Sequence, residues 1–488
     1  MRGRSKFLDY EPVTRRPASQ GPKDRDLTKG ESRPLDSSLG SVLTTQTTLP
    51  VERTGDLGKE TATPGKPRLG SFRESWILRR GHSASFAGLF FFTTVLYFRP
   101  YEFAALSWLS TSAYWIALAT LTVYFPTQLG LEGNLTARPR EVKLLLWLLL
   151  CALLSIPLAI NPGEAWETFT DSFIKVVLMF LVMVNVVRTK LRLNALIFLA
   201  MAVSLMLSLN AINDYRLGRL ELRGARIAGS IGGMFENPND LAMHLVLIAP
   251  LVFAFVLSTR SFVLRILYGS LGTLMLMAVI VTFSRGGFLA LIAGSGIFIF
   301  KVSRKNRVVA LIVMGVALMT FLAFAPGGYA DRIGSIFKTG SDITGSSGAR
   351  EQLLTRSTHV TLRHPLLGVG MGNFHYHSIQ EQVTHNSYTQ VGSEMGIVAM
   401  IIYTMFIIAP YRKLQRIEIE TANKNDQKWA HYLAIGLQSG LVAYLVVSFF
   451  GSIAYLWYLY YLVGYSVCLR RVYTSLANAT PGVARLSL

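Results

Sequence analysis

The stretch NDLAMHLVLIAPLVFAFVLS, residues 239–258, decides the class of fold. Its only charged residue is Asp240, and it has the length of about 20 residues with which an α-helix crosses a bilayer core. Similar apolar blocks recur from about residue 83 onward, and the chain is 51% hydrophobic and 16% charged. Soluble domains carry about 25% charged residues. The sequence therefore predicts an all-α polytopic membrane protein and argues against a water-soluble enzyme.

The apolar blocks number about twelve, and their spacing predicts spans that begin near residues 83, 103, 143, 172, 193, 239, 264, 286, 308, 391, 430 and 453. Every second connection is basic, around residues 138–143, 188–192, 260–265, 301–307, 412–416 and 470–471. Basic residues collect in cytoplasmic loops, so both termini are expected in the cytoplasm. The same rule accounts for the net charge of +20 without a nucleic-acid partner.

Four regions follow from this pattern. Residues 1–72 are rich in Gly, Pro, Ser, Thr and charges, a composition that predicts a disordered cytoplasmic tail. A transmembrane domain is expected over residues 83–470, and residues 471–488 form a short cytoplasmic tail. One large outer loop, residues 326–390, separates the ninth and tenth spans.

Several arginines occur on the side that this topology places outside. The connection 212–238 carries Arg216, Arg219, Arg223 and Arg226, and the turn 284–287 carries Arg285. Solvation, Glu221 or lipid headgroups can account for Arg216 and Arg219. A guanidinium at membrane depth is costly without an anion, and its planar fork fits phosphate. Arg285 therefore indicates an anionic ligand held at the membrane.

The segment MFENPNDLA, residues 234–242, predicts a helix start that faces outward. Asn237 suits the N-cap, Pro238 the first helical position and Asp240 the acid of a capping box. The free N–H groups of this helix end would add positive potential beside Arg226. A well-capped helix without a ligand explains the same residues.

The outer loop contains five of the eight histidines, namely His359, His364, His375, His377 and His385. Long connections are usually functional, so short helices are expected here, packed over the outer membrane face. The sequence has no HExxH motif, and the spacing of the histidines does not indicate a metal site. The glycines of HPLLGVGMGNF, residues 364–374, are interpreted as allowing the backbone to approach the membrane surface or a ligand.

Three motifs in order resemble one known family. They are RIAGSIGGMFENPNDLA (226–242), FSRGGFLAL (283–291), and HPLLGVGMGNF (364–374) followed by THNSYTQVGSEMGI (384–397). Across about twelve spans with one large outer loop, this order resembles the O-antigen ligase and Wzy-type polymerase superfamily. The resemblance covers roughly residues 80–470.

The resemblance implies an inverting, metal-independent glycosyltransferase with a GT-C-like membrane fold and no cofactor. Such enzymes transfer a glycan from undecaprenyl pyrophosphate to a hydroxyl group of lipid A core, a glycan or a protein. By motif, Arg226 and Arg285 match the arginines that bind pyrophosphate, Arg350 matches a further loop arginine, and His385 matches the histidine that activates the acceptor. The positioning residues are then Asn237, Pro238, Asn239, Asn386 and Glu394. Glu394 either orients His385 or pairs with an arginine, whereas the alternative role for His385 is to cap the tenth span.

The resemblance also implies a location, the bacterial inner membrane with the active site facing the periplasm. Ligase and polymerase share these motifs, so the sequence does not separate them. A flippase or transporter of lipid-linked glycans would need the same cations. Transporters usually show internal repeats, which this sequence lacks.

Overall fold

The computed structural model describes residues 69–103, 111–219, 227, 235, 237–304, 306–309, 312, 314–316, 319, 346–378 and 381–479. Within these residues every regular element is a helix, so the expectation of an all-α protein is confirmed. Most of the predicted tail, residues 1–68, and the ends of several connections lie outside the described residues.

Eight helical segments are long and apolar enough to cross a membrane. They are Arg140–Leu158 (α4 and the 3-10 turn η3), Pro162–Val186 (α5, the π-helical turn η4 and α6), Lys190–Arg216 (α7), Pro238–Ser258 (α8), Phe262–Val281 (α9), Arg285–Val302 (α10), Ser387–Thr421 (α14) and Asn425–Val447 (η8 and α15). This confirms the polytopic membrane class.

Three further long helices, α1 (Leu69–Phe98), α3 (Ser112–Glu132) and α16 (Trp457–Ala479), lie at expected spans but are not among these eight. They are more polar, since α3 contains Gln128 and Glu132 and α16 contains Arg470 and Arg471. The expected span near 308 lies partly outside the described residues, so the count of twelve stays a prediction.

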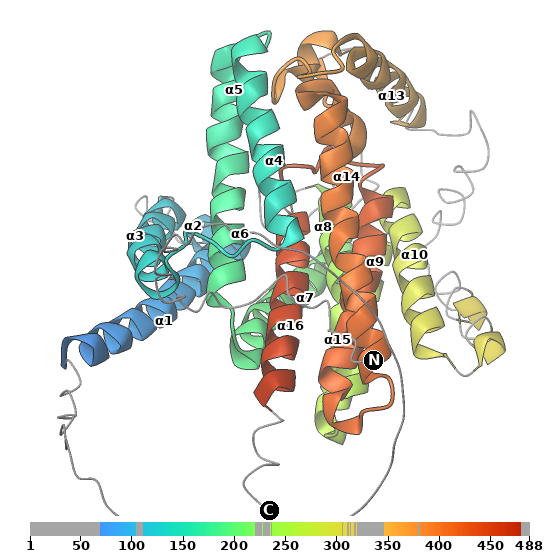
Figure 1. Ribbon diagram of the computed structural model, residues 1–488. Coiled ribbons are helices and arrows are strands. Elements are labelled where there is room, and N and C mark those ends of the chain that lie inside the picture. The colour runs from blue at the N-terminus through green and yellow to red at the C-terminus, as the bar shows by residue number, and fades with distance from the viewer. Residues whose placement is uncertain are drawn as a thin grey trace, which may run out of the picture.

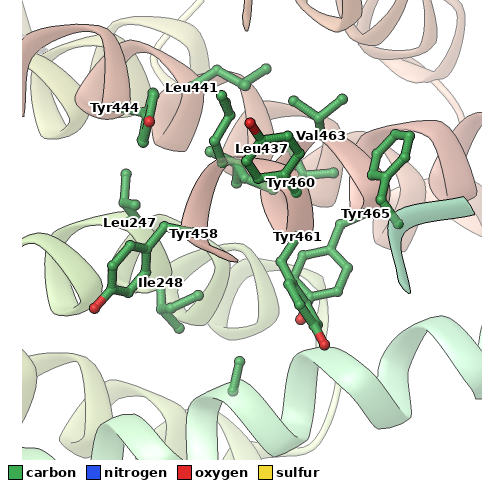
Figure 2. Packing of buried hydrophobic residues seen from close by; sticks show 14 of the residues in the cluster. Leu247, Ile248, Leu437, Leu441, Tyr444, Tyr458, Tyr460, Tyr461, Val463 and Tyr465 are labelled. Carbon is green, nitrogen blue, oxygen red and sulfur yellow. The ribbon is translucent and has the colours of Figure 1, made fainter. Parts of the chain in front are cut away.

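The core of the bundle lies where α15 packs against α8, α10, α14 and α16. A Cβ atom on Gly436 would lie 2.8 Å from the Pro250 carbonyl oxygen of α8, and one on Gly440 would lie 3.2 Å from that of Leu247. These two glycines, four residues apart, let α8 and α15 approach closely. Figure 2 shows Tyr460 of α16 beside Leu437 of α15.

The described part of the outer loop, residues 346–378 and 381–386, covers one end of the bundle, which we call the loop end. Helix α13 (Ser346–Arg363) lies across the start of α14 (Figure 1), and its Ser357 donates to Thr389 Oγ1 at 2.8 Å. The 3-10 helix η6 (Asn373–His377) follows. The Asn373 side chain accepts from the Asn161 N–H at 2.6 Å, which joins the loop to the N-cap of α5. The loop is therefore held against the start of the helical segment Pro162–Val186.

The opposite end of the bundle holds its basic residues in ion pairs. Arg470 binds Glu141 with both guanidinium nitrogens, and the buried Glu418 accepts from Lys301 at 2.8 Å and Arg304 at 3.0 Å. Residues 471–479 continue α16, and residues 69–72 belong to α1. The domain boundaries given by the sequence analysis stay predictions.

Candidate active site at the loop end

Asn386 and His385 have different roles at the start of α14. The Asn386 side chain accepts from the N–H groups of Tyr388 at 2.9 Å and Thr389 at 3.1 Å, so it is the N-cap. His385 precedes the cap with a left-handed φ of 52°. Because Asn386 caps the helix, the alternative capping role for His385 does not apply.

The connection between α15 and α16, residues 448–456, lies directly against this helix start. The Ser448 carbonyl accepts from the Ser387 N–H at 2.8 Å, and the Gly451 carbonyl accepts from the Ser387 hydroxyl at 2.7 Å. The Ser452 hydroxyl accepts from the His385 N–H, also at 2.8 Å. The backbone of His385 is therefore fixed by a segment more than sixty residues away in the sequence.

The starts of α8 and α10 meet the other side of the same connection. Ser284 is the N-cap of α10, and its hydroxyl donates to the Asn239 side chain at 2.9 Å. A Cβ atom on Gly286 would lie 2.9 Å from Cβ of Phe450. A small cavity separates the three elements, lined by Asn239, Asp240, Met243, Ser284, Gly286, Val447, Phe450, Gly451 and Ile453.

Three helix N-termini thus surround one short segment, residues 449–452. Four residues span at most about 14 Å, so the starts of α8, α10 and α14 lie close together. Each helix end carries about half a positive charge, which favours an anion nearby. Arg285 is the half-buried first residue of α10 and adds a full cation. This end of the bundle is suited to a phosphate-bearing ligand.

Two residues next to these helix starts have an unusual, left-handed backbone conformation. Four non-glycine residues among those described have positive φ, and two of them, Phe283 (51°) and His385 (52°), immediately precede the N-caps of α10 and α14. Such conformations persist only where the surrounding structure holds them, and they concentrate at functional sites.

Arg350 approaches His385 from α13. Ser357, which contacts α14, lies seven positions after Arg350, so both residues share one face of α13, about two turns apart. Arg350 therefore extends beyond the start of α14 on the side of His385. Burial lowers the pKa of His385 from its ordinary 6.5, and the Arg350 charge lowers it further. The imidazole is half-buried, and its lowered pKa favours the neutral form, in which one ring nitrogen can accept a proton.

Comparison with known proteins finds a family match. Residues 270–404 match the family described as O-antigen ligase, and this segment contains Arg285, Arg350 and His385 together. This match supports the resemblance of the chain to the O-antigen ligase and Wzy-type superfamily. It supports a membrane glycosyltransferase-like ligase or polymerase that acts on lipid-linked glycans.

Two further comparisons add no argument about function. A chain from a peptidoglycan synthase complex that coordinates polymerization and crosslinking is similar in structure, with a TM-score of 0.39 and 14% identity over 68% of this chain and 96% of that chain. No curated protein sequence matches the chain.

Glu394 makes contacts within the protein other than the two that the sequence analysis considers. Its carboxylate accepts from the Tyr455 hydroxyl at 2.7 Å and from the Gly372 backbone, and it lies about 10 Å along α14 from Ser387. It neither orients His385 nor pairs with an arginine in the described structure. Glu394 instead ties the outer loop and the α15–α16 connection to α14.

The loop glycine Gly368 and the helix glycine Gly396 allow the outer loop to pack closely against α14. The interpretation of the loop glycines as contacts to the membrane or a ligand stays a prediction. Gly396 breaks α14 with a φ of 90°, and the freed Ile397 N–H donates to the Pro365 carbonyl at 2.8 Å. A Cβ atom on Gly396 would lie 2.3 Å from the Leu366 carbonyl oxygen, and one on Gly368 would lie 2.3 Å from the Glu394 carbonyl carbon. Only glycine permits this approach of the loop to α14.

The other residues that the sequence predicts for this site lie at several different places or outside the described residues. Asn237 caps α8 by accepting from the Asn239 N–H at 2.9 Å, and Pro238 is its first residue. Asp240 makes no capping-box hydrogen bond among the described residues and lines the cavity. Arg226 lies outside the described residues, as does Glu221, and Arg219 pairs with Asp214 at 3.4 Å. No group of three or more metal-ligating side chains occurs in the described part of the chain.

Sequence reasoning missed the α15–α16 connection. Its residues Phe449–Ser452 read FFGS, and an ordinary turn between two apolar spans has the same composition. The Gly-Ser pair was the only local signal. Its importance follows from contacts with residues 284–286 and 384–387, which one sequence does not show.

Proposed function

We propose that the protein transfers a glycan from undecaprenyl pyrophosphate to an acceptor hydroxyl, as an inverting glycosyltransferase of the O-antigen ligase type. The acceptor is lipid A core, a glycan chain or a protein side chain. The observation that carries the proposal is the convergence of three helix N-termini and Arg285 beside a histidine whose imidazole is available.

The donor site requires groups that stabilise a departing pyrophosphate. Negative charge develops on the leaving oxygen as the bond to the anomeric carbon breaks, and preorganised N–H groups and cations lower the barrier. The starts of α8, α10 and α14 supply the positive ends of three helix dipoles, and Arg285 supplies a cation. By the family motif, Arg226 supplies a second one, so this proposal uses neither a metal ion nor another cofactor.

The acceptor side requires a base that is neutral at physiological pH. The acceptor oxygen attacks the anomeric carbon, its proton passes to His385, and undecaprenyl pyrophosphate leaves with the electron pair. One displacement of this kind inverts the anomeric configuration. A positioned general base typically contributes about 10²- to 10⁴-fold to the rate. The lowered pKa keeps His385 in the required neutral form.

The proposed orientation places the loop end in the periplasm of a bacterial inner membrane and both termini in the cytoplasm. The ion-paired basic end of the bundle lies opposite the loop end, which supports this direction. Lipid-linked donor and acceptor would then meet at the outer face.

Reconstitution tests the proposal directly. Purified protein in liposomes receives an undecaprenyl-pyrophosphate-linked glycan with or without acceptor, and release of undecaprenyl pyrophosphate is measured. We expect release only with acceptor, and a loss of about 10²-fold or more in Arg285→Ala. Movement of donor across the bilayer without acceptor, with no release, would contradict the proposal and favour a flippase. Extension of one glycan by another would identify the Wzy-type polymerase.

A further inference from the structure

We infer that Ser452 is a positioning residue for the transfer reaction, because its hydroxyl fixes the backbone from which His385 reaches the acceptor. The inference rests on the proposed function. Ser452 lies in the α15–α16 connection, outside the family match over residues 270–404.

The conformation of His385 requires such support. A φ of 52° is unfavourable for a residue with a Cβ atom, and the N–H of this strained residue donates to the Ser452 hydroxyl. The direction of the side chain is therefore set by the backbone of residues 384–386.

The Ser452 hydroxyl forms two contacts that define this backbone. It accepts from the His385 N–H and contacts Thr384 Oγ1, both at 2.8 Å. Thr384 Oγ1 in turn donates to the Asn386 carbonyl at 3.0 Å. Since Thr384 uses its proton on Asn386, Ser452 donates to Thr384, and one hydroxyl serves as donor and acceptor. The chain Ser452–Thr384–Asn386 thus encloses His385 on both sides.

Ser452 is itself held in place on each side. Its neighbour Gly451 accepts from the Ser387 hydroxyl at 2.7 Å, and its neighbour Ile453 donates to the same hydroxyl at 3.1 Å. On the far side, Phe450 packs against Gly286, next to Arg285. The segment therefore sets the separation between the base and the cation of the donor site.

The test compares Ser452→Ala with Ser452→Thr and with Ser448→Ala in the full-length protein. Ser448 is a matched control, since it belongs to the same connection and its hydroxyl contacts Tyr388 instead of His385. We expect kcat of Ser452→Ala to fall about 10- to 100-fold, because small displacements of a catalytic group have effects of this size. The donor KM should stay within about twofold, because ground-state binding is unchanged. Ser452→Thr should recover most of kcat, and Ser448→Ala should resemble wild type.

A double variant separates positioning from general destabilisation. In a protein that already carries His385→Ala, Ser452→Ala should cause no further loss, since the group that it positions is gone. Additive losses, or equal losses in Ser448→Ala, would overturn the inference. If wild type transfers glycan and His385→Ala does not, while Ser452→Ala is fully active, only this inference fails. If His385→Ala is also fully active, the proposed role of His385 fails instead.

Discussion

At the scale of single residues, burial and the charge of Arg350 both lower the proton affinity of His385. Burial and the Arg350 guanidinium both disfavour the imidazolium form and lower the pKa of His385 below 6.5. A general base works only when neutral, so the acid limb of kcat/KM should lie below pH 6.5. In Arg350→Gln the pKa of His385 rises, and this limb should move to higher pH.

The pH dependence of kcat/KM between about pH 5 and 8 measures this shift. Arg350→Lys retains the charge and should keep the limb near its wild-type position. Arg356→Gln is a control on the same helix, because Arg356 contacts the His377 carbonyl instead. An acid limb that stays in place in Arg350→Gln would show that the two groups are not coupled.

Because the backbone of His385 is strained, we expect a substitution there to abolish glycan transfer without lowering the stability of the fold. Asn tolerates left-handed φ better than other residues that carry a Cβ atom. His385→Asn should therefore be as stable as wild type or more so, by up to about 1 kcal/mol, while transfer is lost. Thermal unfolding in detergent and glycan transfer, measured on the same preparation, check both parts. A large loss of stability would mean that the histidine serves the fold.

At the scale of elements, the break in α14 joins the outer loop to the bundle. Gly396→Ala would force a left-handed residue with a side chain against the Leu366 carbonyl, 2.3 Å from the new Cβ atom. We expect a loss of about 2–4 kcal/mol in stability, and reduced transfer because α13 and Arg350 would shift.

Gly348→Ala is the matched control for this change. Gly348 lies in α13, and a Cβ atom added there meets nothing within 4 Å. Its substitution should stabilise the helix by about 0.5–1 kcal/mol. Equal thermal unfolding of the two variants would show that the loop does not depend on the break.

Local signals explain which elements the sequence predicts well. The span at 239–258 and its start at Asn237 and Pro238 follow from hydropathy and capping, which depend on near neighbours. The packing of the loop glycines and the Glu394–Tyr455 contact depend on residues far apart in the sequence. His385 and Arg285 could be chosen by resemblance, whereas Ser452 could not, because only the fold brings it to residue 385.

At the scale of the whole molecule, the buried ion pairs lie at one end of the helix bundle and the candidate active site lies at the other. Arg470→Met would leave the fully buried Glu141 without its partner, at a cost of about 3–5 kcal/mol. Replacement of both residues, with Glu141→Gln added, should recover much of this loss. The kcat of the folded fraction should stay at the wild-type value in both variants. A selective fall in kcat would mean that the opposite end takes part in the reaction.

The assignment of the site to the loop end depends most on His385, and its removal from the native host is the most direct test. Surface glycan and extracted lipid-linked intermediates are compared for wild type, His385→Ala and His359→Ala, an exposed histidine of α13. We predict that His385→Ala, at normal protein level, loses mature surface glycan. If the protein is a ligase, long chains should accumulate on the lipid carrier. If it is a polymerase, single repeat units should accumulate there. His359→Ala should match wild type. An unchanged glycan profile in His385→Ala would contradict the account.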